Sequence, residues 1–394
     1  MDSSEIRSDR AGSVSAIPGG LCAFVPDRFP PALRIEGELL LALSRAEAAL
    51  GALDGAVGLL PAMERLVVPM QIAEAAASCR IEGASLDWEE ALEADLLPSV
   101  PTDTELHDIK HYLQAQRVAW SKRGTMPLDL EAVRTLHGEI MTGPRGNLAS
   151  PGEFRQIQIF VGVRQKRLAT ASYVPPPQAL VPGLMQAWER YAQEDGSLPP
   201  LLQTALLHGQ FELIHPFRDG NGKTGRLLMG LFLQSRGRLQ HPVLFLSQWF
   251  EKHRRDYYEL LRGISHDGEW EEWALYFLDG VTEQSAKAVA TLRELARLRE
   301  DLRCRLKTAK ATGTAPNLID TLFENPYTST ARVTSKLGVS VPTARGALAL
   351  LANCGVIEEL TGRKRGQRFC ATPILEALRG PVEEVPELVG HQIC

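Results

Sequence analysis

The segment from His215 to Arg226, HPFRDGNGKTGR, gathers residue types that handle phosphate groups. Gly220 and Gly222 flank Asn221, and this spacing lets successive backbone N–H groups converge into a nest that binds an anion. A helix that begins near Lys223 would add its N-terminal N–H groups and its dipole to the same nest. The pattern therefore predicts a phosphate site between two helices.

Charged and basic side chains complete this predicted site. Lys223 and Arg226 lie one helical turn apart and place two cations on one face of the second helix. Asp219 offers a hard oxygen ligand, which suits a Mg²⁺ ion that bridges phosphates. His215 stands at the mouth of the turn, where a neutral imidazole can accept a proton. Together these groups predict nucleotidyl or phosphoryl transfer from a nucleotide.

Two known phosphate loops do not fit this segment. The tripeptide GKT at 222–224 looks like the end of a Walker loop, but that loop needs a glycine where Phe217 stands. The glycines also satisfy the dinucleotide pattern GxGxxG, which requires a strand before it and an acid about 20 residues after it. The preceding LLQTALLHGQFELI spaces its apolar residues as a helix, and the next acidic residue is Glu251. Both loops are therefore excluded.

The elements that must position this site are mainly helical. The 394 residues are 44% hydrophobic and 23% charged, as in globular proteins of two to three domains. Asp129 is placed to cap one of the helices. The spacing of apolar residues predicts helices at about 36–60, 63–82, 87–96, 104–123, 128–141, 178–193, 199–214, 225–237, 248–264 and 269–305.

Two stretches depart from this helical pattern. Residues 1–35 are rich in Ser, Gly and Pro, and we expect them to be frayed at the start of the chain. Residues 157–163 and 169–174 carry alternating and β-branched side chains around a polar turn, which predicts a short hairpin. The prolines at 175–177 then end any ladder or helix.

A second module follows toward the C-terminus. From Pro316 onward, three short helical segments precede two strand-like arms around the basic turn Arg363–Arg365, which is the order of a winged helix-turn-helix. Residues 286–394 hold 16 Lys and Arg against 11 Asp and Glu, whereas residues 1–285 hold 27 against 37. A basic module on an acidic body indicates DNA as a partner. Such modules also bind proteins and form homodimers, so these alternatives stay open.

Several features bear on the cellular setting. The N-terminal sequence has acidic residues and no apolar core, so we expect no secretory signal. No apolar run approaches the roughly 18 residues of a membrane-spanning helix, so we expect no membrane partner. The six cysteines are scattered without a CxxC pair, which favours a reducing compartment. We therefore expect a cytoplasmic protein.

The segment at 215–226 resembles the signature of the Fic family, HPFxxGNGRxxR. Lys223 departs from that signature, which usually has arginine there; lysine keeps the charge but loses the bidentate fork. The resemblance implies an enzyme that transfers AMP from ATP to a hydroxyl group of a protein. It also implies the fold class: a mainly α, helical Fic domain with a short β-hairpin flap, followed here by the small C-terminal winged helix-turn-helix domain.

The resemblance assigns roles to individual residues. His215 would deprotonate a target Ser, Thr or Tyr, whose oxygen attacks the α-phosphate and releases pyrophosphate. Asp219 would hold Mg²⁺, and Phe217 would be a buried anchor of the loop. The turn 220–222 would cradle the α- and β-phosphates, and Arg226 would bind the γ-phosphate. The ATP-binding residues implied are Glu82, Gly220, Asn221, Gly222, Lys223, Thr224, Gly225, Arg226, His253 and Tyr258.

Two further segments extend the resemblance. PGEFR at 151–155 resembles the opening of the family's target-docking flap, which pairs with a target backbone by strand addition. SQWFEKHRRDYYELL resembles the segment that lines the adenine pocket. Tyr258 is the better stacking candidate of its two tyrosines, and His253 stands where relatives often carry asparagine. The flap residues implied are Ile157, Gln158, Ile159, Phe160, Val161 and Gly162.

The segment Ser78–Gly83 has the form SxxxEG at the end of a predicted helix. In the Fic family this pattern marks an inhibitory helix, here at about 63–83. Glu82 would pair with Arg226 as a bidentate carboxylate and would occupy the fork that the γ-phosphate needs. Ser78 lies one turn before Glu82, where it could hydrogen-bond to that carboxylate.

Two functions follow from these observations. The first is an autoinhibited protein adenylyltransferase that modifies another protein or itself. The alternative is a nucleotide-sensing, DNA-binding transcriptional regulator with a weak or inactive Fic-like body. Transfer of UMP, phosphate or phosphocholine, and removal of AMP, occur in relatives and stay open. The predicted organisation is an N-terminal helical region at 1–100, a Fic catalytic domain at 101–285, a connecting helix at 286–310, a winged helix domain at 311–380 and a tail at 381–394.

Overall fold

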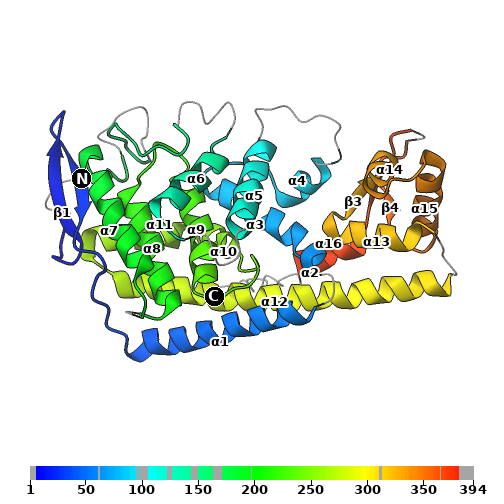
Figure 1. The fold of residues 1–394 in the computed structure, drawn as a ribbon, viewed down its shortest axis with the longest axis horizontal. Helices are drawn as coiled ribbons and strands as arrows, with labels where there is room; N and C mark the ends of the chain where they lie inside the picture. The colour runs from blue at the N-terminus through cyan, green and yellow to red at the C-terminus, as the bar shows by residue number, and fades with distance from the viewer. Residues whose placement is uncertain are drawn as a thin grey trace, which may run out of the picture. The chain divides into compact units, whose positions relative to one another are not determined.

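The computed structural model describes residues 6–60, 63–94, 96, 105–121, 127–142, 150–162, 171–196, 198–309, 313–363 and 365–380. These residues are mainly helical, as the sequence predicts (Figure 1). They fall into two compact units, one formed by Met1–Leu60 with Met70–Val289 and the other by Pro61–Pro69 with Ala290–Cys394. Within the described ranges, no single helix is long and apolar enough to cross a membrane, although Gly37–Leu59 and Met63–Ile81 meet that test when taken together as a bent pair.

The first unit is built around α8 (Pro200–Ile214), which is buried on nearly all sides. The next helix, α9 (Asn221–Ser235), packs beside it (Figure 1). Asp129 caps its helix as predicted, because its carboxylate accepts a hydrogen bond from the N–H of Ala132 at 2.8 Å. The other helices are α1 (Gly37–Leu59), α3 (Val68–Ile81), α4 (Trp88–Ala94), α5 (Glu105–Ser121), α6 (Leu130–Ile140), α7 (Val181–Gln193), α10 (Leu246–Lys252), α11 (Arg254–Asp267) and α12 (Trp270–Thr308), whose C-terminal part enters the second unit.

Two helices that the sequence predicts as continuous are each broken. The predicted helix at 63–82 consists of α2 (Met63–Leu66) and α3, because Pro69 lacks the N–H that a continuing helix needs. The predicted helix at 248–264 divides into α10 and α11 at His253, whose φ of −108° and ψ of 38° are not helical. Neither proline nor glycine marks this second bend in the sequence.

The very start of the chain, where we expect fraying, lies outside the described residues, but residues 12–26 form a hairpin that the sequence analysis did not predict. Strands β1 (Gly12–Ile17) and β2 (Leu21–Pro26) form an antiparallel hairpin. Gly19 and Gly20 turn between them with φ of 90° and 72°, as a tight hairpin turn requires. Phe24 is fully buried, and its N–H donates to the carbonyl of Val174 at 2.9 Å. The alternating pattern of VSAI and LCAFVP on either side of Pro-Gly-Gly is typical of a hairpin. The high Ser and Gly content of residues 1–35 made this pattern hard to recognise.

The predicted flap is only partly described, since residues 163–170 lie outside the described ranges. Val161 and Tyr173 form one isolated antiparallel bridge, with the N–H of Val161 2.9 Å from the carbonyl of Tyr173. The hydroxyl of Tyr173 donates to the carbonyl of Leu213 at 2.6 Å. The described part of the flap is therefore tied to the C-terminal turn of α8.

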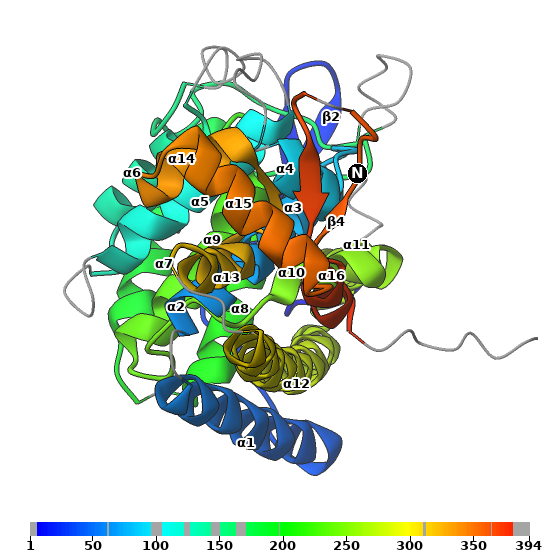
Figure 2. The same ribbon diagram turned by 90° about the vertical axis from the view of Figure 1, so that its right-hand side faces the viewer.

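The second unit holds the elements of the C-terminal module (Figure 2). Their order is α13 (Ala315–Glu324), β3 (Tyr327–Ser329), α14 (Thr330–Leu337), α15 (Val341–Asn353), β4 (Glu358–Glu359), β5 (Arg368–Cys370) and α16 (Thr372–Arg379). The strands form an antiparallel sheet in the order β3-β5-β4. Three helices followed by two strands, β4 and β5, stand in the order that the sequence predicts, whereas β3 and α16 were not predicted. Lys364 of the basic turn and the tail 381–394 lie outside the described residues.

Candidate active site

The predicted phosphate segment forms the turn between α8 and α9. His215 follows the last residue of α8 in the left-handed conformation, with φ of 50°. A non-glycine residue adopts this conformation only when its surroundings hold it there. Gly220 is also left-handed, with φ of 74°, and α9 begins at the next residue. The N-terminal N–H groups of α9 thus face the turn, as an anion nest requires.

Side chains inside the turn hold its shape. The amide of Asn221 accepts from the N–H of Phe217 at 2.8 Å and donates to its carbonyl at 2.9 Å. Phe217 is fully buried, as predicted, and stacks on His137 with ring centroids 3.6 Å apart. Nδ1 of His137 accepts from the N–H of Gly152, so its Nε2 donates to the carbonyl of Asp219. Burial lowers the pKa of His137 to about 4, which keeps the ring neutral.

Arg155 clamps the same turn from the flap side, a role that sequence reasoning missed. This guanidinium is 4% exposed and donates to four backbone carbonyls. Two belong to the start of the turn, Ile214 at 3.4 Å and His215 at 2.9 Å. The others belong to the flap, Pro176 at 2.6 Å and Ile157 at 3.3 Å. The only sequence signal was the place of Arg155 in PGEFR.

The geometry of His215 leaves one ring nitrogen available as a base. Nδ1 lies 3.2 Å from the carbonyl oxygen of Glu212, which can only accept, so Nδ1 carries the proton. Nε2 therefore holds a free lone pair. Burial lowers the pKa of His215 below its ordinary value of 6.5 and keeps the imidazole neutral at pH 7. These are the properties that a general base requires.

The structure brings Glu82 and Arg226 together. Arg226 is 3% exposed, and its Nη2 lies 2.8 Å from Oε1 of Glu82. Burial opposes ionisation of Glu82, but the charge of Arg226 outweighs it and holds the pKa of this carboxyl below its ordinary value. The contact joins one oxygen to one nitrogen, so the pairing is not the predicted bidentate one.

Ser78 takes a different partner from the one predicted. Its hydroxyl accepts from Nε of Arg226 at 2.9 Å, and its carbonyl accepts from Nη2 at 2.9 Å. The side chain of Ser78 therefore orients the guanidinium rather than the carboxylate of Glu82. Arg226 is positioned by α3 through two contacts that do not depend on Glu82.

The carboxylate of Glu82 also lies against the first turn of α9. A Cβ placed on Gly222 would collide with Oε1 of Glu82 and would lie 2.8 Å from Nη1 of Arg226. Only glycine leaves this space at the first turn of α9. An acidic oxygen of the protein thus sits where the helix terminus and Arg226 favour an anion.

Lys223 is placed differently from the sequence expectation. Its Nζ lies 3.6 Å from Oδ2 of Asp108 on α5, and its side chain is 13% exposed. The two cations of α9 therefore face different carboxylates. Asp108 lies far from Lys223 in the sequence, and no spacing rule could have identified it.

A cleft of about 710 Å³ opens beside His215. Tyr258 is 45% exposed there, and its hydroxyl donates to the carbonyl of Ile81 at 3.3 Å. Tyr257 instead lies in the core, 3.0 Å from His208. The cleft lining joins α3, the flap, α8 and α11, and it includes Glu82, Val161, Gly162, Tyr173, Glu212, His215, Arg254, Tyr258 and Arg262.

Other predicted site residues lie outside this lining. His253 packs on Trp249 with ring centroids 4.0 Å apart, at the bend between α10 and α11. The hydroxyl of Thr224 donates to the carbonyl of Gly220 at 2.9 Å and stabilises the first turn of α9. Gly225 faces the side chains of Phe211 and Glu212, which lets α8 and α9 approach closely. The contacts of these residues are structural.

Glu212 is a further acid of the site that the sequence did not reveal. Its Oε1 is buried and has no hydrogen-bond partner among the described residues. Burial raises the pKa of Glu212 to about 8, so this group is mostly protonated at pH 7. The cleft therefore carries a neutral carboxyl group within one turn of the candidate base.

A helical fold in which a glycine-rich turn places a histidine base beside the N-terminus of a helix is suited to a reaction at a phosphate group. Comparison with known protein families gives two matches. The Fic/DOC family matches residues 127–233, and the Fic/DOC family N-terminal region matches residues 40–121. Residues 40–121 and 127–233 of this chain are therefore similar to the two regions of the Fic/DOC family.

Individual relatives agree with this assignment. The protein adenylyltransferase Fic of Drosophila grimshawi is 34% identical over 130 residues, which are 32% of this chain and 24% of that protein. The protein of the same name from Drosophila melanogaster is 33% identical over 130 residues. The match thus spans about a quarter of these curated relatives. A Fic family protein from Desulfovibrio desulfuricans shares the fold, with a TM-score of 0.57 and 21% identity over 87% of this chain and 98% of that one.

Proposed function

We propose that this protein is an autoinhibited protein adenylyltransferase, which moves AMP from ATP to a Ser, Thr or Tyr hydroxyl group of a protein. One observation carries the proposal: a neutral histidine with a free Nε2 stands beside a helix N-terminus, against which a carboxylate of the protein pairs with Arg226. The curated Drosophila relatives are named protein adenylyltransferases, which supports the same activity.

His215 begins the proposed reaction. Its Nε2 takes the proton of the target hydroxyl, while Nδ1–H stays bonded to the carbonyl of Glu212. The target oxygen attacks the α-phosphorus, and the bond from the α-phosphorus to the bridging oxygen of pyrophosphate breaks. The nest at the start of α9 and Arg226 stabilise the phosphate charge. The cleft beside Tyr258 has a volume that suits a nucleotide.

Asp219 fits a role in holding Mg²⁺. It is exposed at the turn, and its Oδ1 accepts from the N–H of Gly220 at 2.7 Å. Within the described residues, no three His, Cys, Asp or Glu side chains gather as a metal site. A single carboxylate suits Mg²⁺ because this ion is commonly held by one carboxylate, nucleotide phosphates and water. When bound, the ion would neutralise phosphate charge.

Glu82 supplies the proposed inhibition. Its carboxylate fills the nest and uses the Nη2 group of Arg226, so the γ-phosphate must displace it to bind productively. The target protein would dock along the flap near Val161 and Gly162, which line the cleft.

Incubation with ATP labelled in the α-phosphate and with Mg²⁺ tests this function. We expect label on the protein itself or on an added protein, more with Glu82→Gly than with the natural sequence, and none with His215→Ala. Unlabelled protein in all variants that bind ATP would contradict the proposal. Intact mass with each nucleotide identifies the transferred group.

A second candidate function is DNA binding by the C-terminal unit, either beside the enzyme activity or as a regulator that senses nucleotide. Helix α15 exposes Thr343 and Arg345, and the turn after β4 exposes Arg363 and Arg365. We propose that these groups contact DNA, with binding to duplex DNA that weakens steeply with salt. Arg345→Gln should reduce that binding. A homodimer through the same unit is the competing outcome, measured by light scattering.

The proposed location is the cytoplasm. The cysteines Cys22, Cys79, Cys304, Cys354 and Cys370 are all free, which supports a reducing compartment.

A further inference from the structure

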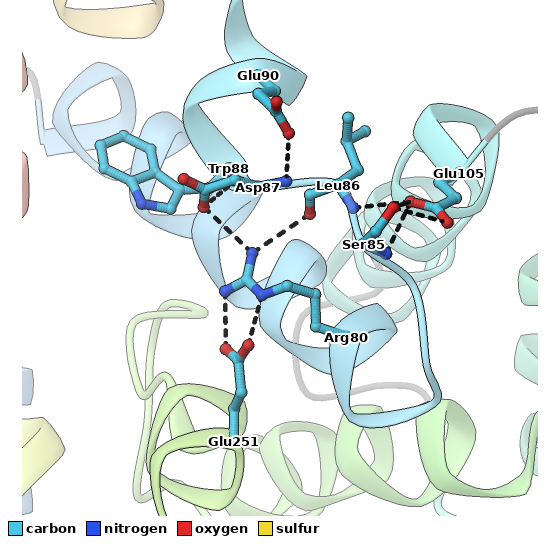
Figure 3. A network of polar contacts seen from close by, with 8 residues as sticks. All are labelled: Arg80, Ser85, Leu86, Asp87, Trp88, Glu90, Glu105 and Glu251. Atoms are coloured by element: carbon cyan, nitrogen blue, oxygen red, sulfur yellow. Dashed lines mark hydrogen bonds and ion pairs between the residues drawn. The ribbon is translucent and has the colours of Figure 1, made fainter.

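A network of polar contacts surrounds Arg80, outside the cleft (Figure 3). Arg80 lies in the last turn of α3, two residues before Glu82. Its Nε lies 2.5 Å from Oε1 of Glu251, and its Nη2 lies 2.7 Å from Oε2. The two side chains are 21% and 28% exposed. Such a two-pronged, partly buried pair fixes the position of both groups more firmly than a surface ion pair does.

The remaining nitrogen of Arg80 reaches the turn that follows Glu82. Nη1 lies 3.3 Å from the carbonyl of Leu86 and 3.3 Å from Oδ1 of Asp87 (Figure 3). Glu105 at the start of α5 holds the same turn, because its Oε2 accepts from the N–H of Ser85 at 2.9 Å and of Leu86 at 2.7 Å. The turn is thus fastened on two sides.

Glu82 lies between these two fastened segments. Gly83 ends α3 with φ of 98°, its N–H donates to the carbonyl of Arg80 at 3.0 Å, and the N–H of Ala84 donates to Cys79 at 3.1 Å. The side chain of Glu82 itself is 38% exposed and has one ion pair, with Arg226. The backbone on either side therefore contributes, together with Arg226, to the position of this carboxylate.

We infer that Arg80, through its pair with Glu251, is a positioning residue for Glu82 and holds the carboxylate in the anion nest. Glu251 belongs to α10, which leads directly into α11 and its cleft residues Arg254 and Tyr258. The pair joins the inhibitory segment to the helices that form the nucleotide wall. This inference rests on the proposed function, because it concerns the strength of the inhibition.

Transfer assays on two backgrounds test the inference. Arg80→Gln and Glu251→Gln each remove the charge pair, and we expect each to raise the initial rate of AMP transfer by roughly fivefold. On the Glu82→Gly background the same changes should leave the rate unaltered, since no carboxylate remains to be positioned. Arg80→Lys keeps the charge but not the fork and should give a smaller rise.

Arg255→Gln is the matched control. Arg255 forms an ion pair with Glu259 at 2.9 Å within α11, and among the described residues no hydrogen bond or ion pair joins it to α3 or to the turn at 83–87. It should change the rate on neither background. An equal rise on both backgrounds, or no rise in folded Arg80→Gln and Glu251→Gln, overturns the inference. Thermal unfolding of each variant establishes that it is folded. If Arg80→Gln does not fold, Glu251→Gln alone tests the inference.

Hydrogen exchange provides a readout that does not depend on transfer. The N–H groups of residues 83–86 are all bonded within the fastened turn. Arg80→Gln should speed their exchange several-fold, and Arg255→Gln should not. Unchanged exchange overturns the inference. If Glu82→Gly transfers no AMP, the proposed function fails, and the exchange measurement still decides whether Arg80 fixes this segment.

Discussion

Replacement of Glu82 by glycine should convert the protein into a much faster transferase. The carboxylate of Glu82 lies against Gly222 and on Nη2 of Arg226, where the γ-phosphate of ATP would bind in the proposed reaction. Loss of the side chain leaves Arg226 in place, because Nε and Nη2 keep their bonds to Ser78 at 2.9 Å each. The variant therefore frees the site without removing the cation that the phosphate needs.

The size of the effect follows from the free energy that is needed to displace Glu82 from Arg226 when ATP binds productively. A hydrogen bond between charged groups contributes about 1.5–3 kcal/mol. Because the Glu82 side chain is 38% exposed, solvent screens the pair, and the lower part of that range applies. About 1.5–2 kcal/mol corresponds to a roughly 10- to 30-fold faster transfer. Glu82→Gln, which keeps a neutral oxygen acceptor, should give a smaller rise.

The assay is the initial rate of label incorporation from ATP labelled in the α-phosphate, at fixed Mg²⁺ and with a fixed amount of folded protein. His215→Ala combined with Glu82→Gly serves as the blank. Equal rates for Glu82→Gly and the natural sequence would refute the competition between carboxylate and phosphate. A loss of ATP binding in Glu82→Gly would refute the claim that Ser78 alone keeps Arg226 in position.

Three further results are expected. His215→Ala should abolish transfer while the Kd for ATP changes little in calorimetry, and residual transfer would mean that another group is the base. Burial lowers the pKa of His215, so its imidazole becomes protonated only at a pH below 6.5. The transfer rate of Glu82→Gly should therefore stay constant down to pH 6.5 and fall at more acidic pH. A fall of this rate that begins above pH 6.5 would contradict the reasoning. Arg155→Met removes a clamp on four carbonyls, so it should lower kcat and destabilise the fold by about 1–3 kcal/mol, measured by denaturant unfolding, with an unchanged kcat as the contrary outcome.

The chemistry of the turn could be predicted from the sequence because its groups are contiguous. A base, a carboxylate, two glycines and a cation lie within one short segment, and glycine spacing alone defines a nest between two helices. The anchor role of Phe217 and the cap at Asp129 are equally local. The bend at His253 was not predicted because neither proline nor glycine marks it, and the N-terminal hairpin was missed because the Ser and Gly content of the segment hid its alternating pattern.

What the sequence by itself determined is thus the local chemistry: which atoms of residues 215–226 can accept a proton or hold an anion. The tertiary structure decided which distant groups act on them. It placed Asp108 on Lys223 and the Arg155 guanidinium under the turn. It also brought Glu82 to Arg226, a pair that the family resemblance predicted but that the local spacing of residues could not. These partners are far apart in the chain, and no spacing of residues in the sequence shows which distant, oppositely charged side chains will meet. Burial then set the proton positions, since only the folded surroundings keep His215 neutral.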